Sequence, residues 1–292
     1  MTFATPISFT EDKTVFDYAA WDRIWAGAFD DAPSQNTDAP LWVSKNLPDG
    51  SHGIFALADD EVVGFVSVFT DDILHAWIAD IAVHSDHQRT GIGKELLRCV
   101  TEKFGHLSIK IHAVQEPAQS LCAKAGLTHR TDLTPCARKG AEQGTWQADA
   151  LAEMGLSVSN DIAPGHKTKV QELLTGAGFQ SASAALDASG GLEKFLGSLV
   201  TAFLVLDGDE PVAFARVISN NSNAAWLSEL CVREDRRCEG IGTALLNDVN
   251  RTFASQALYL AAPSSTVAFF EGQEMPPKTK WVKVFHMVPG ET

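Results

Sequence analysis

The sequence lacks most of the features that mark secreted, membrane or nucleic-acid-binding proteins. Its 292 residues hold five cysteines, an odd number scattered along the chain, which argues against a disulfide framework and for a reducing compartment. No apolar run approaches the roughly 20 residues that span a bilayer, and residues 1–6 lack the basic and apolar regions of a signal peptide. With 23 Lys and Arg against 37 Asp and Glu, the net charge of −14 leaves no dense basic stripe for phosphates. We therefore expect a soluble, cytoplasmic, globular protein whose partners include neither nucleic acid nor a membrane.

The chain contains an internal duplication. A shift of 149 residues lays residues 76–83 on 225–232 and 91–93 on 240–242 without a gap, and 9 of the 22 positions from 76 to 97 are identical. Because this period is half the chain length, it indicates a duplicated domain and not an array of short repeats. We place the boundary within 138–155, which predicts one domain over 1–145 and a second over 146–292.

Both copies are predicted to have the same order of elements: strand, helix, strand hairpin, strand, helix, strand, helix, strand. The fold class is α/β, with a mostly antiparallel mixed sheet in each copy and helices on both of its faces. The last segment of the second copy, 280–288, is a clear strand. Its counterpart at 131–138 contains Pro135, so it should be an edge or irregular strand. The other expected elements are a first helix over 15–29, hairpins at 53–69 and 201–218, strands ending at Val83 and Val232, helices over 93–104 and 242–253, and strands over 107–114 and 257–261.

A glycine-rich turn lies between a strand and a helix in each copy, at residues 88–94 and 237–243. The start of a helix offers backbone N–H groups without intrahelical partners, and glycine lets an anion approach them closely, so both turns are predicted to bind phosphate. The spacing excludes two other phosphate loops. A nucleotide P-loop needs Gly-x4-Gly-Lys-Ser/Thr, but Gln88 stands where the first glycine should be and Glu95 follows Lys94. A dinucleotide fingerprint needs a small residue where Leu96 and Leu245 stand.

The pattern Gln/Arg-x-x-Gly-x-Gly, formed by Gln88, Gly91 and Gly93 and repeated from Arg237, resembles the signature of the GNAT superfamily of acyl-CoA-dependent N-acyltransferases. The resemblance covers most of both halves and implies two tandem GNAT-like domains. It also implies that coenzyme A places its pyrophosphate on the amides of 89–94 or 238–243 and its pantetheine along 81–83 or 230–232. The cofactor-binding residues implied in this way are Ile81, Ala82, Val83, Gln88, Arg89, Thr90, Gly91, Ile92, Gly93 and Lys94 in the first copy. Those in the second copy are Leu230, Cys231, Val232, Arg237, Cys238, Glu239, Gly240, Ile241, Gly242 and Thr243.

Asp80 and Glu229 occupy equivalent places in the strand before the turn. Each is interpreted either as the catalytic base or ammonium anchor near the thioester, or as a carboxylate hydrogen-bonded within the sheet. Glu229 is favoured as the base because of its longer reach. The tyrosine by which this family commonly protonates the leaving thiolate is absent, and Cys122 stands in that place in the first copy. His84 and His87 have metal-like spacing but no third ligand, so no metal site is expected.

The resemblance implies transfer of an acetyl or other acyl group from acetyl-CoA to an amine of a small molecule or peptide by direct attack. The alternative is a CoA-binding or interaction module in which catalysis is degenerate in one or both domains. A third reading makes one copy a structural half that completes the substrate cleft of the other. We expect a monomer or homodimer.

Overall fold

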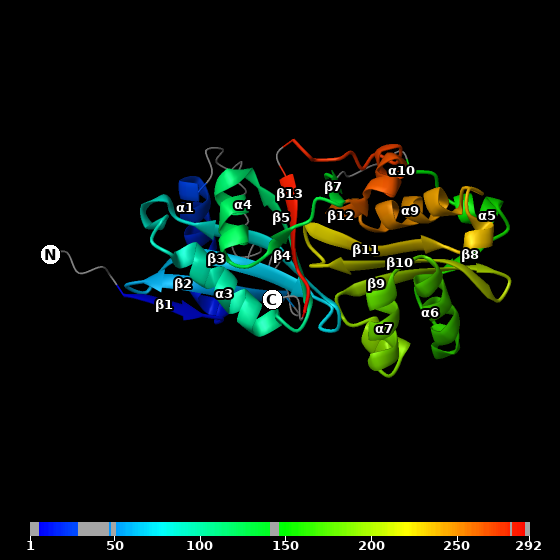
Figure 1. The fold of residues 1–292 in the computed structure, drawn as a ribbon, viewed down its shortest axis with the longest axis horizontal. Helices are drawn as coiled ribbons and strands as arrows, with labels where there is room; N and C mark the ends of the chain where they lie inside the picture. Colours follow the sequence, from blue (N-terminus) through cyan, green and yellow to red (C-terminus); the bar gives the residue numbers. More distant parts are fainter. Residues whose placement is uncertain (1–5, 29–46, 48–50, 141–145, 281, 290–292) are drawn as a thin grey trace. The chain divides into compact units, whose positions relative to one another are not determined.

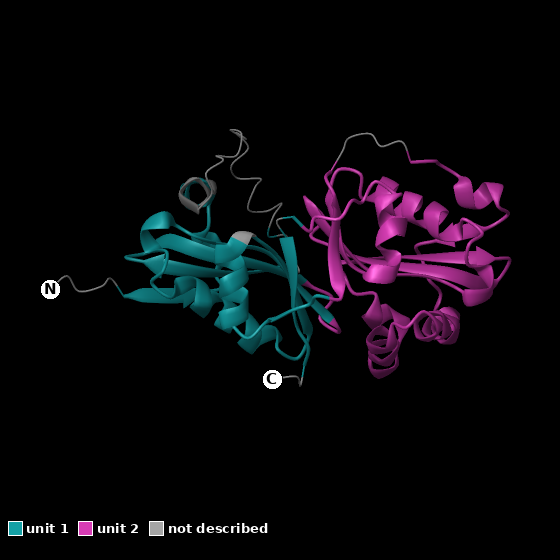
Figure 2. Ribbon diagram, turned by 45° about the horizontal axis from the view of Figure 1, so that its top comes forward, with its two compact units in different colours: residues 1–69, 75–131, 280–292 teal, residues 70–74, 132–279 magenta. Residues whose placement is uncertain are grey.

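The structure is a computed structural model that describes residues 6–28, 47, 51–140, 146–280 and 282–289. It contains two compact units, which Figure 2 shows in different colours. The first unit comprises residues 1–69, 75–131 and 280–292, and the second comprises 70–74 and 132–279. Phe29, expected in the first helix, and residues 141–145, expected in the loop between the copies, lie outside the described residues.

The first unit has a seven-stranded sheet with the order β1-β2-β3-β4-β5-β13-β6 (Figure 1). In this sheet β4 pairs in parallel with β5, whereas the pairs β1–β2, β2–β3, β5–β13 and β13–β6 are antiparallel. The sheet is therefore mostly antiparallel, as predicted. Its strands are β1 Ile7–Thr10, β2 Ser51–Ala58, β3 Glu61–Thr70, β4 His75–Val83, β5 Ser108–Val114, β6 Thr128–His129 and β13 Val282–Met287. Its α-helices are α1 Tyr18–Ala28, α3 Ile92–Phe104 and α4 Gln115–Lys124.

The second unit has a six-stranded sheet with the order β7-β12-β11-β10-β9-β8, in which β11 and β12 form the parallel pair. Figure 1 shows α6 and α7 on one side of this sheet and α9 and α10 on the other. The strands are β7 Leu133–Arg138, β8 Ser157–Ser159, β9 Val200–Asp207, β10 Glu210–Ser219, β11 Ala224–Val232 and β12 Ala257–Pro263. The α-helices are α5 Ala150–Glu153, α6 Lys167–Gly176, α7 Gln180–Ala188, α8 Leu192–Phe195, α9 Ile241–Thr252 and α10 Val267–Glu271.

The last strands of the two copies are exchanged between the sheets. β13, from the end of the second copy, pairs antiparallel with β5 of the first unit, and β7, from the end of the first copy, pairs with β12 of the second. β7 is an edge strand, as Pro135 predicts. The compact units are therefore not continuous in sequence, whereas the division into 1–145 and 146–292 follows the repeat; that division stays a prediction.

Each sheet is covered on both faces. In the first unit α3 buries Ile92, Leu96 and Val100 against one face, while Phe16 and Ile24 cover the other. In the second unit α9 lies over the core that contains Val217 and Leu227, and α6 to α8 form a second core with Phe214. The helix spacing of three and four residues explains these apolar stripes. No helix in the described part of the chain is both long and apolar enough to cross a membrane.

Candidate active site

In each unit the two parallel strands pair over only part of their length. The register between β4 and β5 runs from His75 with Ser108 to Ile78 with Ile111, although β4 continues to Val83. In the second unit the β11–β12 register ends at Trp226, and β11 continues to Val232. Each sheet thus has a strand end whose backbone, among the described residues, has left its parallel neighbour before the glycine-rich turn begins.

The turn in the first unit has a backbone shape that favours glycine. Gly91 has φ +101° and ψ −10°, and Arg89 also has a positive φ of +60°. The Glu95 N–H donates to the Gly91 carbonyl at 3.0 Å, so the N–H groups of residues 92–94 precede the first bond of α3. Gln88 Nε2 donates to the Val83 carbonyl at 3.0 Å and fastens the turn to the end of β4.

The turn in the second unit has nearly the same shape. Gly240 has φ +90°, Cys238 has φ +65°, and the Ala244 N–H donates to the Gly240 carbonyl at 3.0 Å. Arg237 takes the place of Gln88, since its Nε donates to the Val232 carbonyl at 3.2 Å. The carboxylate of Glu239, which would oppose a pyrophosphate, pairs at 2.8 Å with Arg236 on the exposed surface.

Both turns leave room for a ligand. A Cβ placed on Gly91 or on Gly240 would meet no atom within 4 Å. Each turn therefore combines a left-handed glycine, open space beside it and helix N–H groups, which suits a bound diphosphate. Arg89 and Lys94, expected as phosphate partners, are exposed at the first turn, and their role stays a prediction.

Asp80 in the first unit is paired with a neutral hydroxyl. Ser67 on β3 donates from Oγ to Asp80 Oδ2 and accepts from the Asp80 N–H, both at 3.1 Å. Asp80 is partly exposed, whereas Ser67 is buried. Burial raises the pKa of Asp80 above its usual 3.8, and the bond from Ser67 offsets only part of that effect. A partly exposed carboxyl with a raised pKa is suited to general-base chemistry.

Glu229 in the second unit has a very different environment. Its Oε2 accepts from Arg216 Nε at 2.8 Å, and Ser228 Oγ donates to the same oxygen at 2.5 Å. Arg216 also donates from Nη1 to Asp71 Oδ2 at 2.7 Å, and its guanidinium lies 4.3 Å from the centre of the Phe195 ring. Burial alone would lower the pKa of Arg216, but Glu229 and Asp71 outweigh it and the pKa is raised.

This network is closed to solvent. The Arg216 and Asp71 side chains are 0% exposed and that of Glu229 is 2% exposed. The backbone carbonyl of Phe195 in α8 also accepts from Arg216 Nη1, at 3.3 Å. The expectation that Glu229 is the better base is not favoured by this geometry, because an ion pair holds its carboxylate in the core and an amine has no open path to it.

Ser67, Asp71 and Arg216 are important residues that the sequence reasoning did not single out. The signal was available for two of them, since the 149-residue shift places Ser67 on Arg216 as it places Asp80 on Glu229. Asp71 has no such signal. It lies in the turn between β3 and β4 but belongs to the second compact unit.

The residues near the expected thiolate acid are apolar or buried. Cys122 is 0% exposed in the core beneath α3, and burial raises the pKa of its thiol to about 12. Phe269 approaches the position of a Cβ on Gly242 at 3.7 Å. Trp77 and Trp226 are core residues. Among the described residues, no group of three His, Cys, Asp or Glu side chains could hold a metal ion.

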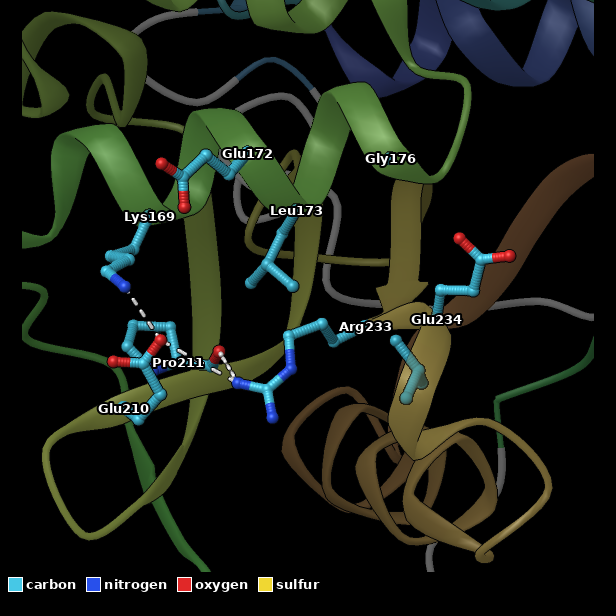
Figure 3. Close-up of a pocket in the computed structure, with 9 residues that line it drawn as sticks. Lys169, Glu172, Leu173, Gly176, Glu210, Pro211, Arg233 and Glu234 are labelled. Carbon is cyan, nitrogen blue, oxygen red and sulfur yellow. Dashed lines mark hydrogen bonds and ion pairs between the residues drawn. The ribbon is translucent and has the colours of Figure 1, made fainter.

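A small pocket lies beside the strand end of the second unit. Its volume is about 140 Å³, and its lining residues are Lys169, Glu172, Leu173, Gly176, Glu210, Pro211, Val232, Arg233 and Glu234. Figure 3 shows Lys169 and Arg233 approaching Glu210 from two sides, at 2.8 and 3.7 Å. The three carboxylates of the lining outnumber these two cations, so the pocket does not suit a diphosphate.

Comparison with known proteins agrees with this geometry. The model of the acetyltransferase (GNAT) family matches residues 20–127 and 175–271. A tandem GNAT protein from the clavulanic acid biosynthesis pathway is similar in structure, with a TM-score of 0.55, 17% identity and coverage of 98% of this chain and 100% of that one. No curated protein matches the chain.

Two further solved structures have the same fold. A GCN5-related N-acetyltransferase from Sphaerobacter thermophilus has a TM-score of 0.55 and 16% identity, over 97% of this chain and 96% of its own. A protein from Pyrococcus horikoshii, described as a putative acetyltransferase, has a TM-score of 0.53 and 15% identity, over 98% of this chain and 90% of its own. With two family matches and a mixed sheet in each unit, the chain is a tandem two-domain member of the acetyltransferase (GNAT) family.

Proposed function

We propose that the protein transfers an acetyl or other acyl group from acyl-CoA to an amine, and that this transfer takes place in the first unit. The observation that carries the choice of unit is the contrast between Asp80 and Glu229. Asp80 is partly exposed and hydrogen-bonded to a neutral hydroxyl, whereas Glu229 is buried in an ion pair with Arg216.

The first unit would hold the acyl donor mainly with its backbone. Residues 89–94 present the N–H groups at the start of α3 to the pyrophosphate, and Arg89 and Lys94 add positive charge. The end of β4 at residues 81–83, where pairing with β5 has stopped, would bind pantetheine as an added strand. A backbone N–H at this strand end would donate to the thioester oxygen as negative charge develops on it.

Asp80 would remove the proton that the acceptor ammonium must lose before attack. The amine nitrogen then forms a bond to the thioester carbon, and the carbon–sulfur bond breaks to release the thiolate and the amide. The second proton of the attacking amine passes to solvent or to the thiolate. With a thiol pKa of about 8.5, the sulfur leaves without a dedicated acid, which fits the apolar neighbours at the place of the family tyrosine.

For the second unit we favour the alternative function, coenzyme binding or structural support without turnover. Its glycine turn has the same shape and open space as the first, but its carboxylate is sealed. The acceptor we propose is a cationic small-molecule or peptide amine, because the net charge of −14 would attract it to the protein.

The location we propose for the protein is the cytoplasm.

The proposal is tested by thiol release from acetyl-CoA with a panel of small amines and peptide N-termini. Amine-dependent release with a matching acylated product is expected. No release with any amine, together with coenzyme A binding in calorimetry, would instead support the binding module. No release and no binding would contradict both functions.

A further inference from the structure

We propose that Ser67 is a positioning residue for Asp80, and that its replacement by Arg216 in the second copy is the change that separates the catalytic from the non-catalytic site. This inference rests on the proposed function, since it assigns a partner to the proposed base. It concerns a residue outside the glycine turn and the coenzyme-binding strand end.

Two hydrogen bonds join these residues, one to the carboxyl group of Asp80 and one from its backbone N–H. Ser67 Oγ donates to Asp80 Oδ2 and accepts from the Asp80 backbone N–H, each at 3.1 Å. Because the hydroxyl is buried on β3, its direction is set by the sheet. Oδ2 is thereby held, and the other carboxyl oxygen is left to meet the proton of an amine.

The face of the sheet on which the pair lies is the one that α1 covers. Phe65 and Ala82, each two residues away along its strand, belong to the core with Phe16 and Ile24 of this face. Thus the carboxyl lies beside the strand end that would bind the thioester, on the face of the sheet that α1 covers.

A neutral partner also sets the proton affinity of Asp80. Burial raises the pKa of the carboxyl, and the hydrogen bond from Ser67 opposes this effect in part. Near β4, burial lowers the pKa of His112 to about 3, which leaves this imidazole neutral. The other charged groups on the elements that pack against β4 are Asp22 and Arg23 on α1, Lys110 on β5 and Glu61 on β3. The charged groups of α3, which covers the opposite face of the sheet, are Lys94, Glu95, Arg98, Glu102 and Lys103.

Arg216 shows what a charged partner does at the same position. It binds Glu229 at 2.8 Å and recruits a second carboxylate, Asp71, at 2.7 Å, with no exposure of its own side chain. A carboxylate held in this way is stabilised in its charged form and is a poor acceptor for a further proton. The residue on the neighbouring strand, Ser67 in one copy and Arg216 in the other, therefore gives the strand carboxylate a neutral partner in the first unit and a charged one in the second.

The experiment compares Ser67→Ala, Ser67→Cys and Ser67→Thr with the wild-type protein over a range of pH. In Ser67→Ala the acid limb of kcat/KM should move up by about one pH unit, because the bond that favours the carboxylate is lost. Ser67→Cys, with a weaker donor, should move it less, and Ser67→Thr should restore the wild-type position. A purely structural role would lower activity evenly without moving the limb.

The carboxyl carbon-13 NMR signal that disappears in Asp80→Asn gives the same titration without turnover. Its apparent pKa should rise in Ser67→Ala and in Ser67→Cys, and Ser67→Cys serves as the test if Ser67→Ala does not fold. An unmoved titration in both variants would overturn this inference while leaving the proposed function intact. Loss of the proposed function would show differently, as a wild-type protein that titrates as described but releases no thiol with any amine.

Discussion

The equivalent sites of the two copies keep the same backbone but have opposite electrostatics. Both have a strand that leaves its parallel neighbour and a left-handed glycine in the turn that follows. Both also have an acidic residue, Asp80 or Glu229, directly before the last three residues of that strand. In the first unit the acid has a serine partner and partial exposure. In the second it is sealed with an arginine and a second carboxylate. A shared fold therefore holds two different carboxylate environments within one chain.

The two carboxylates also affect the stability of the folded protein in opposite ways. A carboxyl with a raised pKa is one whose charged form is less favourable in the folded protein than in the unfolded chain, so Asp80 costs stability at neutral pH. The Arg216 network has the opposite character, since removing any one charge leaves another buried without its partner. We interpret the first arrangement as kept for reactivity and the second as kept for the integrity of the core.

The largest contrast is expected between Asp80→Asn and Glu229→Gln. Asp80→Asn should lower kcat/KM by about 10²- to 10⁴-fold, the usual contribution of a general base. Glu229→Gln should keep activity within about threefold, because the residue has no open path to an amine. Initial rates of thiol release at saturating acetyl-CoA measure both. Equal losses in the two variants would remove the distinction between the sites.

The same pair of variants gives opposite changes in stability. Asp80 is protonated at low pH, and its unfavourable contribution appears as pH rises from the unfolded value near 3.8 through the raised folded pKa. Asp80→Asn should therefore raise the free energy of unfolding at pH 7 but not at pH 3. Glu229→Gln should lower it at pH 7, since Arg216 loses a charged partner. Urea titrations at the two pH values measure the changes.

A smaller effect on activity, but a clear one on stability, is expected for Arg216→Ala. Two buried carboxylates, Asp71 and Glu229, would lose their shared cation, which costs about 3–5 kcal/mol of unfolding free energy. At temperatures at which Arg216→Ala is still folded, its rate of thiol release should stay within about threefold of wild type.

The control for Arg216→Ala removes all three charges together, as Arg216→Met with Asp71→Asn and Glu229→Gln. This variant should recover most of the lost stability, because no unpaired charge remains in the core. If Arg216→Ala unfolded within about 1 kcal/mol of wild type, the network would not have the structural role assigned to it.

The sequence predicted the fold well because the patterns that define it are local. Alternating strands, the apolar stripe of α3 and the glycine turns follow from neighbouring residues, and Pro135 alone predicted an edge strand. The exchange of β7 and β13 was not predictable in this way. Each has six residues, and the strand with which each one pairs lies far away in the sequence.

The backbone of the candidate site could be predicted from the sequence, whereas the surroundings of its two carboxylates could not. The glycine turns and strand ends carry the expected backbone shape because glycine spacing reflects local geometry. Side-chain length favoured Glu229 over Asp80 as the base, whereas the ion pair that buries Glu229 is the ground on which we propose Asp80 instead. Ser67 and Arg216 give the two carboxylates different surroundings, and these partners are found only when the two copies are aligned.

The proposal that acyl transfer takes place in the first unit is tested most directly by comparing Gly91→Glu with Gly240→Glu. The two variants are matched because both glycines have a left-handed φ and open space at Cβ. Each variant places a carboxylate where a diphosphate would bind, and each carries a similar backbone strain. We expect Gly91→Glu to raise KM for acetyl-CoA and to lower kcat/KM by about 100-fold or more, as follows from a loss of several kcal/mol of binding. Gly240→Glu should keep turnover close to wild type. Full activity in Gly91→Glu, with loss in Gly240→Glu, would contradict it.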